Sequence, residues 1–315
     1  MQNREKKGKR MNPVYDLIII GSGPAGLSAA VYAERACLNT LIIEKNMMSG
    51  GQVLTTYEVD NYPGLPGIGG FDLGMKFREH ADGLGARFTE DDVLRIETEG
   101  RIKKVVGQKQ TYETKAVIIA TGAGHRKLGV PGEAEFTGMG VSYCATCDGA
   151  FFKNKVTAVV GGGDVALEDA IFLARMCEKV YVIHRRDEFR GAKSLQTKLQ
   201  SLENVEILWD TVVDSINGDG QVESLSLSNK RTGEKKSLAV NGVFIAVGIT
   251  PVSQAFEGLV EMEHGYIKAG EDGKTSVPGI FAAGDVRTKD LRQIVTAVAD
   301  GANALTSVER YLTEE

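Results

Sequence analysis

YDLIIIGSGPAG, the stretch at residues 15–26, joins a short apolar run to a glycine pattern. The run from Tyr15 to Ile20 has the length and composition of a buried strand. In the pattern G-x-G-x-x-G that follows, the first glycine permits a tight turn, the second lets the backbone approach a pyrophosphate, and the third lets a helix pack closely against a strand. We therefore predict a strand and a helix whose N-terminus faces the phosphates of a bound dinucleotide.

The residues after this pattern complete a βαβ unit. Leu27 to Ala36 is predicted to form a helix, and Leu41 to Ile43 a second strand. Glu44 ends that strand twenty-three residues after Gly21, where a carboxylate accepts hydrogen bonds from ribose hydroxyls. A lone glycine pattern is weak support for a nucleotide site, but strand, helix, second strand and terminal acid together are specific.

The same arrangement occurs a second time. Val156 to Val160 leads into GGGDVA at residues 161–166, and a predicted helix and strand follow, the strand ending before His184. Further along, VFIAVG at residues 243–248 resembles VIIATG at residues 117–122. Because the repeat is more specific than either glycine pattern, we predict an α/β fold with two Rossmann-like, doubly wound dinucleotide-binding domains.

The two copies differ in the charge that follows their second strand. Glu44 stands there in the first copy, whereas the second has His184-Arg185-Arg186 and then Arg190. Guanidinium groups bind a 2′-phosphate, and a carboxylate repels it. The second site is therefore predicted to bind NADPH and the first a dinucleotide with a free ribose; the alternative interpretation of the arginines is a solvated basic turn. The residues assigned to NADPH are Gly161, Gly162, Gly163, Asp164, His184, Arg185, Arg186 and Arg190.

A cysteine pair lies between the two glycine patterns, in CATCD at residues 144–148. A disulfide between such close cysteines encloses a small ring and adds little stability, so it is suited to being broken, and the spacing also favours a reactive thiolate. We interpret Cys144 and Cys147 as a redox dithiol. The alternative is half of a zinc site, but tetrahedral zinc needs four ligands. Cys37 and Cys177 are predicted to be buried small apolar residues, the histidines are scattered, and no metal is predicted.

Composition narrows the class of protein. A chain of 315 residues exceeds one typical hydrophobic core and favours two domains. The net charge of −5 argues against a nucleic-acid surface and against binding to an anionic membrane. Four cysteines indicate a reducing compartment, and no apolar run is long enough for a membrane span. We expect a cytoplasmic protein in which residues 1–14 form a disordered extension.

Taken together, these motifs resemble the low-molecular-weight, bacterial-type thioredoxin reductases of the pyridine nucleotide-disulfide oxidoreductase family. The resemblance runs from about Tyr15 to the C-terminus, and it rests on the following segments: GSGPAG at 21–26, ATG at 120–122, CATCDG at 144–149, HRRD at 184–187 and GD at 284–285. It implies a homodimeric flavoprotein oxidoreductase that passes electrons from NADPH through FAD to the dithiol and on to thioredoxin or a thioredoxin-like protein. It also implies an FAD-binding domain at 15–123 and 250–315, with an NADPH-binding domain inserted at 124–249.

The resemblance also implies individual roles. Cys147 would be the thiol nearer the flavin, Cys144 the thiol that attacks thioredoxin, and Asp148 the proton donor and acceptor. The residues implied to bind FAD are Gly21, Ser22, Gly23, Pro24, Ala25, Gly26, Glu44, Gln52, Asn61, Thr121, Gly122, Gly284, Asp285, Arg292, Gln293 and Ile294. Val165 and Ile294 depart from part of the family.

A related flavin-dependent disulfide reductase, with another small redox partner or electron donor, is the alternative enzyme. The family further implies a rotation of the inserted domain, and glycine-containing joints near 122–124 and 248–250 are placed where hinge changes could be absorbed.

Overall fold

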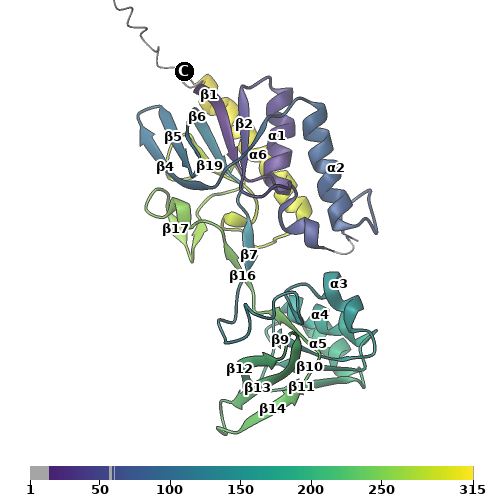
Figure 1. Ribbon diagram of the computed structural model, residues 1–315. Coiled ribbons are helices and arrows are strands. Elements are labelled where there is room, and N and C mark those ends of the chain that lie inside the picture. Colours follow the sequence, from purple (N-terminus) through teal and green to yellow (C-terminus); the bar gives the residue numbers. More distant parts are fainter. Residues whose placement is uncertain (1–13, 57–58, 60, 315) are drawn as a thin grey trace, which may run out of the picture. The chain divides into compact units, whose positions relative to one another are not determined.

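The computed structural model describes residues 14–56, 59 and 61–314 (Figure 1). By contacts, the chain divides into two compact units. One comprises residues up to Leu54, Asp60–Ala123 and the chain from Pro251 onward; the other comprises Thr55–Val59 and Gly124–Thr250. Of the extension predicted at 1–14, residues 1–13 lie outside the described residues, and Val14 begins the first strand.

The first unit is built on a seven-stranded sheet in the order β3-β2-β1-β6-β5-β4, with β19 pairing the end of β6. Strands β1, β2, β3 and β19 run parallel to their neighbours, while β4 and β5 form an antiparallel extension of β6. The strands are β1 Val14–Ile20, β2 Thr40–Glu44, β3 Phe88–Glu90, β4 Val93–Glu99, β5 Ile102–Gly107, β6 Thr111–Ile119 and β19 Ile280–Ala282.

Both faces of this sheet are buried, which explains the unbroken apolar run Leu17–Ile20 at the end of β1. Leu17 and Ile19 pack on one face with helices α1 (Pro24–Arg35) and α6 (Ile294–Thr313). Ile18 and Ile20 pack on the other face, against residues from 255 to 286 and the extension formed by β4 and β5. Helix α2 (Gly70–Gly83) packs against α1 on the helical side (Figure 1).

The second unit repeats this plan. Its parallel sheet has the order β11-β10-β9-β15-β8, so β10, β9 and β15 correspond to β2, β1 and β6 of the first unit. The elements are β8 Val141–Ser142, α3 Ala145–Asp148, β9 Val156–Gly161, α4 Asp164–Ala174, β10 Lys179–Ile183, α5 Lys193–Gln200, β11 Val205–Leu208 and β15 Gly242–Ala246. The predicted fold class, with two Rossmann-like units, is confirmed.

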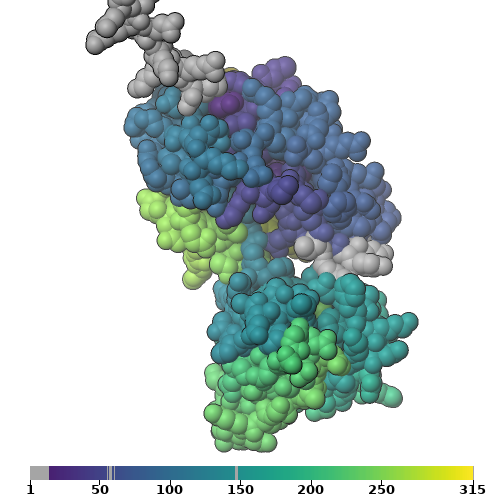
Figure 2. Space-filling view, viewed as in Figure 1, coloured from purple at the N-terminus to yellow at the C-terminus, as the bar shows by residue number. Residues whose placement is uncertain are grey.

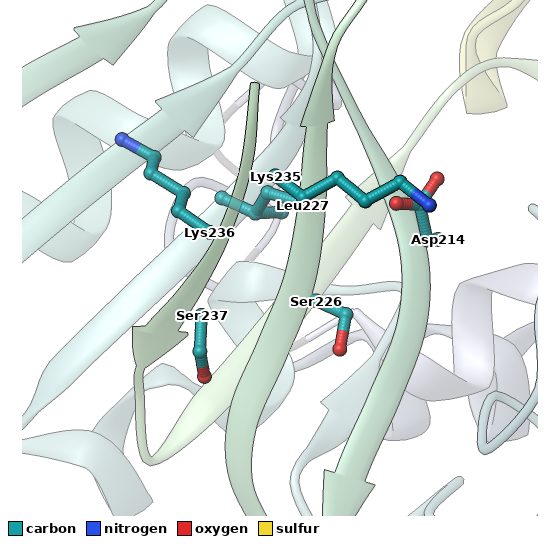
Figure 3. Close-up of a pocket in the computed structure, with 6 residues that line it drawn as sticks. All are labelled: Asp214, Ser226, Leu227, Lys235, Lys236 and Ser237. Carbon is teal, nitrogen blue, oxygen red and sulfur yellow. The ribbon is translucent and has the colours of Figure 1, made fainter. Parts of the chain in front are cut away.

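A three-stranded antiparallel sheet covers the face of the second unit opposite α4. Its strands are β12 Thr211–Gly218, β13 Val222–Asn229 and β14 Lys235–Ala239, coloured green in Figure 2. A shallow groove of about 450 Å³ runs over it, where Figure 3 shows Lys235 extending towards Asp214. None of the predicted site residues lines this groove.

The two segments that join the units, β7 (Ala123–His125) and β16 (Ile249–Pro251), pair as a two-stranded sheet. Gly122 precedes β7 with φ +69° and Gly248 precedes β16 with φ +111°, in the region that favours glycine. Motion at these joints stays a prediction.

Cys37 differs from the sequence prediction. Helix α1 ends in a Schellman motif, because Leu38 N donates to Ala33 O (3.1 Å) and Cys37 N donates to Glu34 O (3.0 Å). Cys37 occupies the left-handed position of this motif, with φ +57°, and its side chain is exposed. The prediction of a buried residue is therefore wrong for Cys37, whereas it is confirmed for Cys177, which is 6% exposed.

Cys37→Gly is expected to stabilise the protein by roughly 0.5–1 kcal/mol, because glycine removes the Cβ that makes the left-handed position costly. Urea unfolding measures the change. Cys37→Ala is the matched control: it removes the sulfur but keeps the Cβ, and it should bring no such gain. Equal stability of the two variants would contradict the strain assigned to Cys37.

Candidate active site

The glycine turn after β1 is packed too tightly for side chains at two positions. A Cβ at Gly21 would lie 2.5 Å from Ala120 O, and a Cβ at Gly26 would lie 2.0 Å from Gly21 O. At Gly23, in contrast, the nearest atom to such a Cβ is 3.9 Å away, and this residue begins α1 without a side-chain cap. The open space beside uncapped backbone N–H groups suits a phosphate, as a dinucleotide requires.

Glu44 lies beside this turn and is held by hydrogen bonds to both carboxylate oxygens. Its Oε2 accepts from Ser22 N (2.8 Å) and Ser22 Oγ (2.7 Å), and its Oε1 accepts from Asn46 N (2.9 Å) and Asn46 Nδ2 (3.2 Å). A carboxylate offers about four acceptor positions, and these hydrogen bonds fill them. A ribose hydroxyl that binds Glu44 would therefore replace one of these bonds. The long bond from the Asn46 side chain is the one most easily replaced.

Several other residues predicted to bind FAD are joined by hydrogen bonds within the first unit. Asn61 Nδ2 donates to Gln293 Oε1 (2.8 Å), although the two residues are far apart in the sequence. Gln293 is also the N-cap of α6, where it forms a capping box with Thr296, and Ile294 begins the helix half-buried. Gln52 Nε2 donates to Ala123 O.

The remaining predicted residues cluster at the ends of β6 and β19. Thr121 Oγ1 donates to Val252 O, and Gly122 O accepts from Val252 N (3.0 Å). Gly284, with φ +80°, begins the 3₁₀ helix Gly284–Val286 that carries Asp285.

Asp285 and Arg292 indicate a cofactor site, because each has a buried polar atom without a hydrogen-bond partner among the described residues. These atoms are Asp285 Oδ1 and Arg292 Nε. Burial raises the pKa of Asp285, and the nearby Lys289 and Arg292 oppose that rise. A buried acceptor and a buried donor that lack partners fit a ligand with hydroxyl and carbonyl groups, such as FAD.

Asp300 of α6 fixes the segment that carries Asp285. Its Oδ2 accepts from Gly284 N (2.9 Å), Arg287 Nε (2.8 Å) and Lys289 Nζ (2.9 Å), and its Oδ1 accepts from Arg287 Nη2 (2.6 Å). The three charged side chains are only 7% exposed. Burial alone would raise the pKa of Asp300, but the bonds from Arg287 and Lys289 outweigh it and hold this pKa below its usual range.

Asp300→Asn is expected to destabilise the protein by about 3–5 kcal/mol at pH 7, because two cations stay buried without their full partner. Since the folded pKa is lowered, the carboxylate contributes its stability above its unfolded pKa of about 3.9, and that contribution is lost as the pH falls towards the folded pKa. In urea unfolding, the difference in the free energy of unfolding between wild type and variant should therefore be smaller at about pH 3.5 than at pH 7. Asp272→Asn, which breaks an exposed pair with Lys274, is the control and should cost less than about 1 kcal/mol. A gap that does not change with pH would contradict the account.

In the second unit, the basic loop at residues 184–191 is hydrogen-bonded to the glycine turn. Arg190 N and Gly191 N both donate to Gly162 O (2.8 and 3.2 Å), and Ala192 N donates to Asp164 Oδ1 (2.7 Å). A Cβ at Gly163, which begins α4 without a side-chain cap, would meet nothing within 4 Å. Open space at the start of α4 and the basic loop therefore lie together.

Unlike Gly163, Gly161 has no room for a side chain, because a Cβ there would lie 2.4 Å from Ala246 O. Arg185, Arg186 and Arg190 are exposed and form no ion pair with a described carboxylate, so their guanidinium groups are available to a phosphate.

His184 is placed differently from the arginines that follow it. It is 6% exposed, contacts the rings of Phe189 and Trp209, and its Nε2 is 2.9 Å from Glu188 O. Burial lowers its pKa, and the neighbouring arginines lower it further. A Cβ at Gly162 would lie 2.2 Å from the imidazole, so His184 packs directly against the glycine turn. It therefore supports this turn rather than presenting an exposed cation.

In the cysteine segment, the short helix α3 of the second unit begins directly after Cys144 and ends at Asp148. Cys144 is disulfide-bonded, whereas Cys37 and Cys177 are free. The side chain of Cys147 lies outside the described part of the structure, so its pairing with Cys144 stays a prediction. Asp148 accepts a hydrogen bond at Oδ2 from Ser142 Oγ (2.6 Å). The sequence interpretation missed Ser142; its signal was a hydroxyl residue two positions before Cys144.

Among residues 14–56, 59 and 61–314, no group of three or more His, Cys, Asp or Glu side chains is arranged to hold a metal ion. In the same part of the chain, no helix is both long and apolar enough to cross a membrane.

The sequence profile of the pyridine nucleotide-disulphide oxidoreductase family matches residues 15–301. The chain belongs to this family. It is 48% identical to a thioredoxin reductase of Listeria innocua over 303 residues, covering 96% of this chain and 95% of that protein. Within the family, the chain is therefore a member of the low-molecular-weight thioredoxin reductases. A crystal structure of thioredoxin reductase from Lactococcus lactis matches with a TM-score of 0.86 and 44% identity, covering 96% and 100% of the two chains. Thioredoxin reductase from T. acidophilum matches with a TM-score of 0.81 and 34% identity, covering 95% and 98%.

Proposed function

We propose that this protein is an NADPH-dependent thioredoxin-disulfide reductase. Electrons pass from NADPH through FAD to a disulfide between Cys144 and Cys147, and from the resulting dithiol to oxidised thioredoxin. The observation that supports it best is the disulfide-bonded Cys144 in the same unit as a basic loop fastened to a nucleotide-binding turn.

The first unit, assigned here as the FAD-binding domain over 15–123 and 250–315, binds and orients the flavin. When bound, FAD accepts a hydride from NADPH and passes two electrons to the disulfide. The start of α1 at Gly23 offers its N–H groups to the pyrophosphate, and Glu44 offers its carboxylate to the ribose. Asp285 and Arg292 supply the buried acceptor and donor that lack partners in the protein.

The second unit, assigned as the NADPH-binding domain over 124–249, selects the electron donor. Gly163 leaves room for the pyrophosphate at the start of α4. The three arginines of the 184–191 loop pair with the 2′-phosphate, which NADH lacks. The loop's hydrogen bonds to Gly162 hold these arginines close to the phosphate site before the nucleotide arrives.

The dithiol carries out the last transfer. Cys144 attacks the thioredoxin disulfide as a thiolate, and Cys147 then attacks Cys144, which releases reduced thioredoxin and restores the enzyme disulfide. Two protons leave the enzyme thiols and two are taken up by the thioredoxin thiolates, so the exchange needs a group that accepts and returns a proton. Asp148, hydrogen-bonded next to the cysteine segment, is assigned that role.

Three further features belong to the proposal: a homodimer, a cytoplasmic location, and a rotation about the joints near Gly122 and Gly248. Both the dithiol and the NADPH residues lie in one unit, so they would take turns at a flavin held by the other.

The test is a steady-state assay with purified FAD-loaded protein, NADPH and thioredoxin, in which NADPH oxidation and thioredoxin thiols are followed together. We expect one dithiol formed for each NADPH oxidised. A glutaredoxin and a peroxiredoxin serve as alternative acceptors, and NADH or reduced ferredoxin as alternative donors. If a different acceptor or donor supports faster turnover, the protein is a related flavin-dependent disulfide reductase instead.

A further inference from the structure

Ser142, at the end of β8, contacts both the cysteine segment and Asp148. Its side chain is 5% exposed. The Ser142 hydroxyl accepts from Cys144 N (3.1 Å), and its oxygen lies 2.6 Å from Asp148 Oδ2 and 3.3 Å from Cys144 O. One buried hydroxyl therefore reaches the proposed acid–base group and both backbone polar groups of the proposed attacking cysteine.

The hydroxyl has fewer hydrogens than it has acceptors nearby. A serine hydroxyl carries one hydrogen to donate and two lone pairs to accept with. Cys144 N–H occupies one lone pair, so one hydrogen and one lone pair remain for Asp148 Oδ2 and Cys144 O. The 2.6 Å separation is that of a strong bond to an ionised carboxylate, whereas 3.3 Å is a long contact.

We propose that Ser142 is a positioning residue that holds Asp148 in one place in both of its protonation states. The inference rests on the acid–base role proposed for Asp148. When Asp148 is a carboxylate, Ser142 Oγ donates to Oδ2. When Asp148 carries a proton, its O–H donates to the free lone pair of Ser142 Oγ, and the serine hydrogen turns to Cys144 O.

This exchange needs rotation of one hydroxyl and little movement of heavier atoms. Asp148 and Cys144 are also joined directly, because Asp148 N donates to Cys144 O (3.2 Å). The main-chain turn and the carboxylate are thus parts of one small network. Without the hydroxyl, the buried side of Asp148 would lose its partner in both states, and the carboxylate would turn towards solvent between proton transfers.

A simpler interpretation is that Ser142 only stabilises the turn through its bond to Cys144 N. The two interpretations differ in one respect. A turn-stabilising serine acts whether or not residue 148 can exchange a proton, whereas the proposed role disappears when residue 148 is an amide.

The experiment is a double-mutant cycle on the FAD-loaded protein with Ser142→Ala, Asp148→Asn and the combined variant. The turnover number and KM for thioredoxin are measured, together with the rate at which NADPH reduces the flavin in stopped flow. Ser142→Ala is expected to lower the turnover number roughly tenfold, the equivalent of one hydrogen bond to a charged group, with little change in KM. In the Asp148→Asn background it should have no further effect. Flavin reduction by NADPH should be similar in all four proteins, which shows that the fold and cofactor sites are intact.

Ser142→Thr keeps the hydroxyl and should stay within about threefold of wild type. Ser142→Val, which matches threonine in shape but lacks the hydroxyl, should lose roughly tenfold, and it replaces Ser142→Ala in the cycle if the alanine variant does not fold. An equal loss of turnover from Ser142→Ala in both Asp148 backgrounds, or wild-type turnover in Ser142→Ala, would overturn the positioning role of Ser142 but not the role of Asp148. Full turnover in Asp148→Asn would overturn both it and the role of Asp148, and failure of the wild type to reduce thioredoxin would overturn the proposed function itself.

Discussion

Cys147→Ser is expected to lower thioredoxin reduction by about 10⁴-fold or more, while NADPH still bleaches the flavin at the wild-type rate. The hydroxyl of serine is not ionised near neutral pH and cannot attack or leave in disulfide exchange. The NADPH and FAD residues lie elsewhere in the chain, so reduction of the flavin does not depend on this thiol. Cys144→Ser should show the same separation of the two half-reactions. Stopped-flow absorbance of the flavin and a steady-state thioredoxin assay measure the two steps.

Cys37→Ser and Cys177→Ser are the matched controls, because these are the cysteines found as free thiols. Cys37→Ser should leave turnover within about twofold of wild type. Cys177 is buried, so Cys177→Ser is expected to lower stability and to leave turnover unchanged at temperatures where the variant is folded. Substantial thioredoxin reduction by Cys147→Ser would exclude the proposed electron path.

Removal of the arginine loop's charge is expected to erase the preference for NADPH. In the triple variant Arg185→Ala, Arg186→Ala and Arg190→Ala, the KM for NADPH should rise roughly 100-fold, because two or more charge-assisted hydrogen bonds to the 2′-phosphate are lost. The KM for NADH should change by less than about threefold, since NADH has no group at that position. Steady-state kinetics with both donors at constant ionic strength measure the effect.

Arg175→Ala is the control for this prediction. Arg175 is an exposed arginine of the same unit, at the C-cap of α4 and outside the 184–191 loop, so its loss should affect neither donor. If the triple variant loses NADH and NADPH activity equally, the loop supports the fold rather than the phosphate. If it loses neither, the arginines form a solvated basic turn.

The features that could be predicted from the sequence are those fixed by local geometry. The turns at Gly21 and Gly161 admit no side chain at their first glycine, and both copies of the repeat share the pattern G-x-G at this point. The apolar strands before them are buried on both faces, so their composition alone identified them. Both βαβ units followed from these patterns, whereas the expectation of an inserted domain came from the resemblance to the family.

Features that depend on distant contacts could not be predicted. His184 occupies the position that suggested phosphate binding, but the rings of Phe189 and Trp209 and the tight space over Gly162 bury it. Asp300 carries no motif, and its importance arises because a helix brings it to Arg287 and the start of the Asp285 segment.

The two remaining differences concern how short segments end. Cys37 and Cys177 are equally spaced from their glycines, yet α1 ends in a Schellman motif at Cys37 whereas α4 ends with Cys177 turned inward. The sequence predicts a helix from Gln293 to Leu305, but α6 continues to Thr313 because Val308 still packs in the core.

The most direct test of the electron path is a count of thiols in the FAD-loaded protein before and after NADPH is added without oxygen. The chain has four cysteines, of which Cys37 and Cys177 are free and Cys144 is disulfide-bonded. The account predicts two thiols per unfolded chain before NADPH and four afterwards, and a return to two when oxidised thioredoxin is then supplied. A count that stays at two after NADPH, while the flavin is bleached, would contradict it.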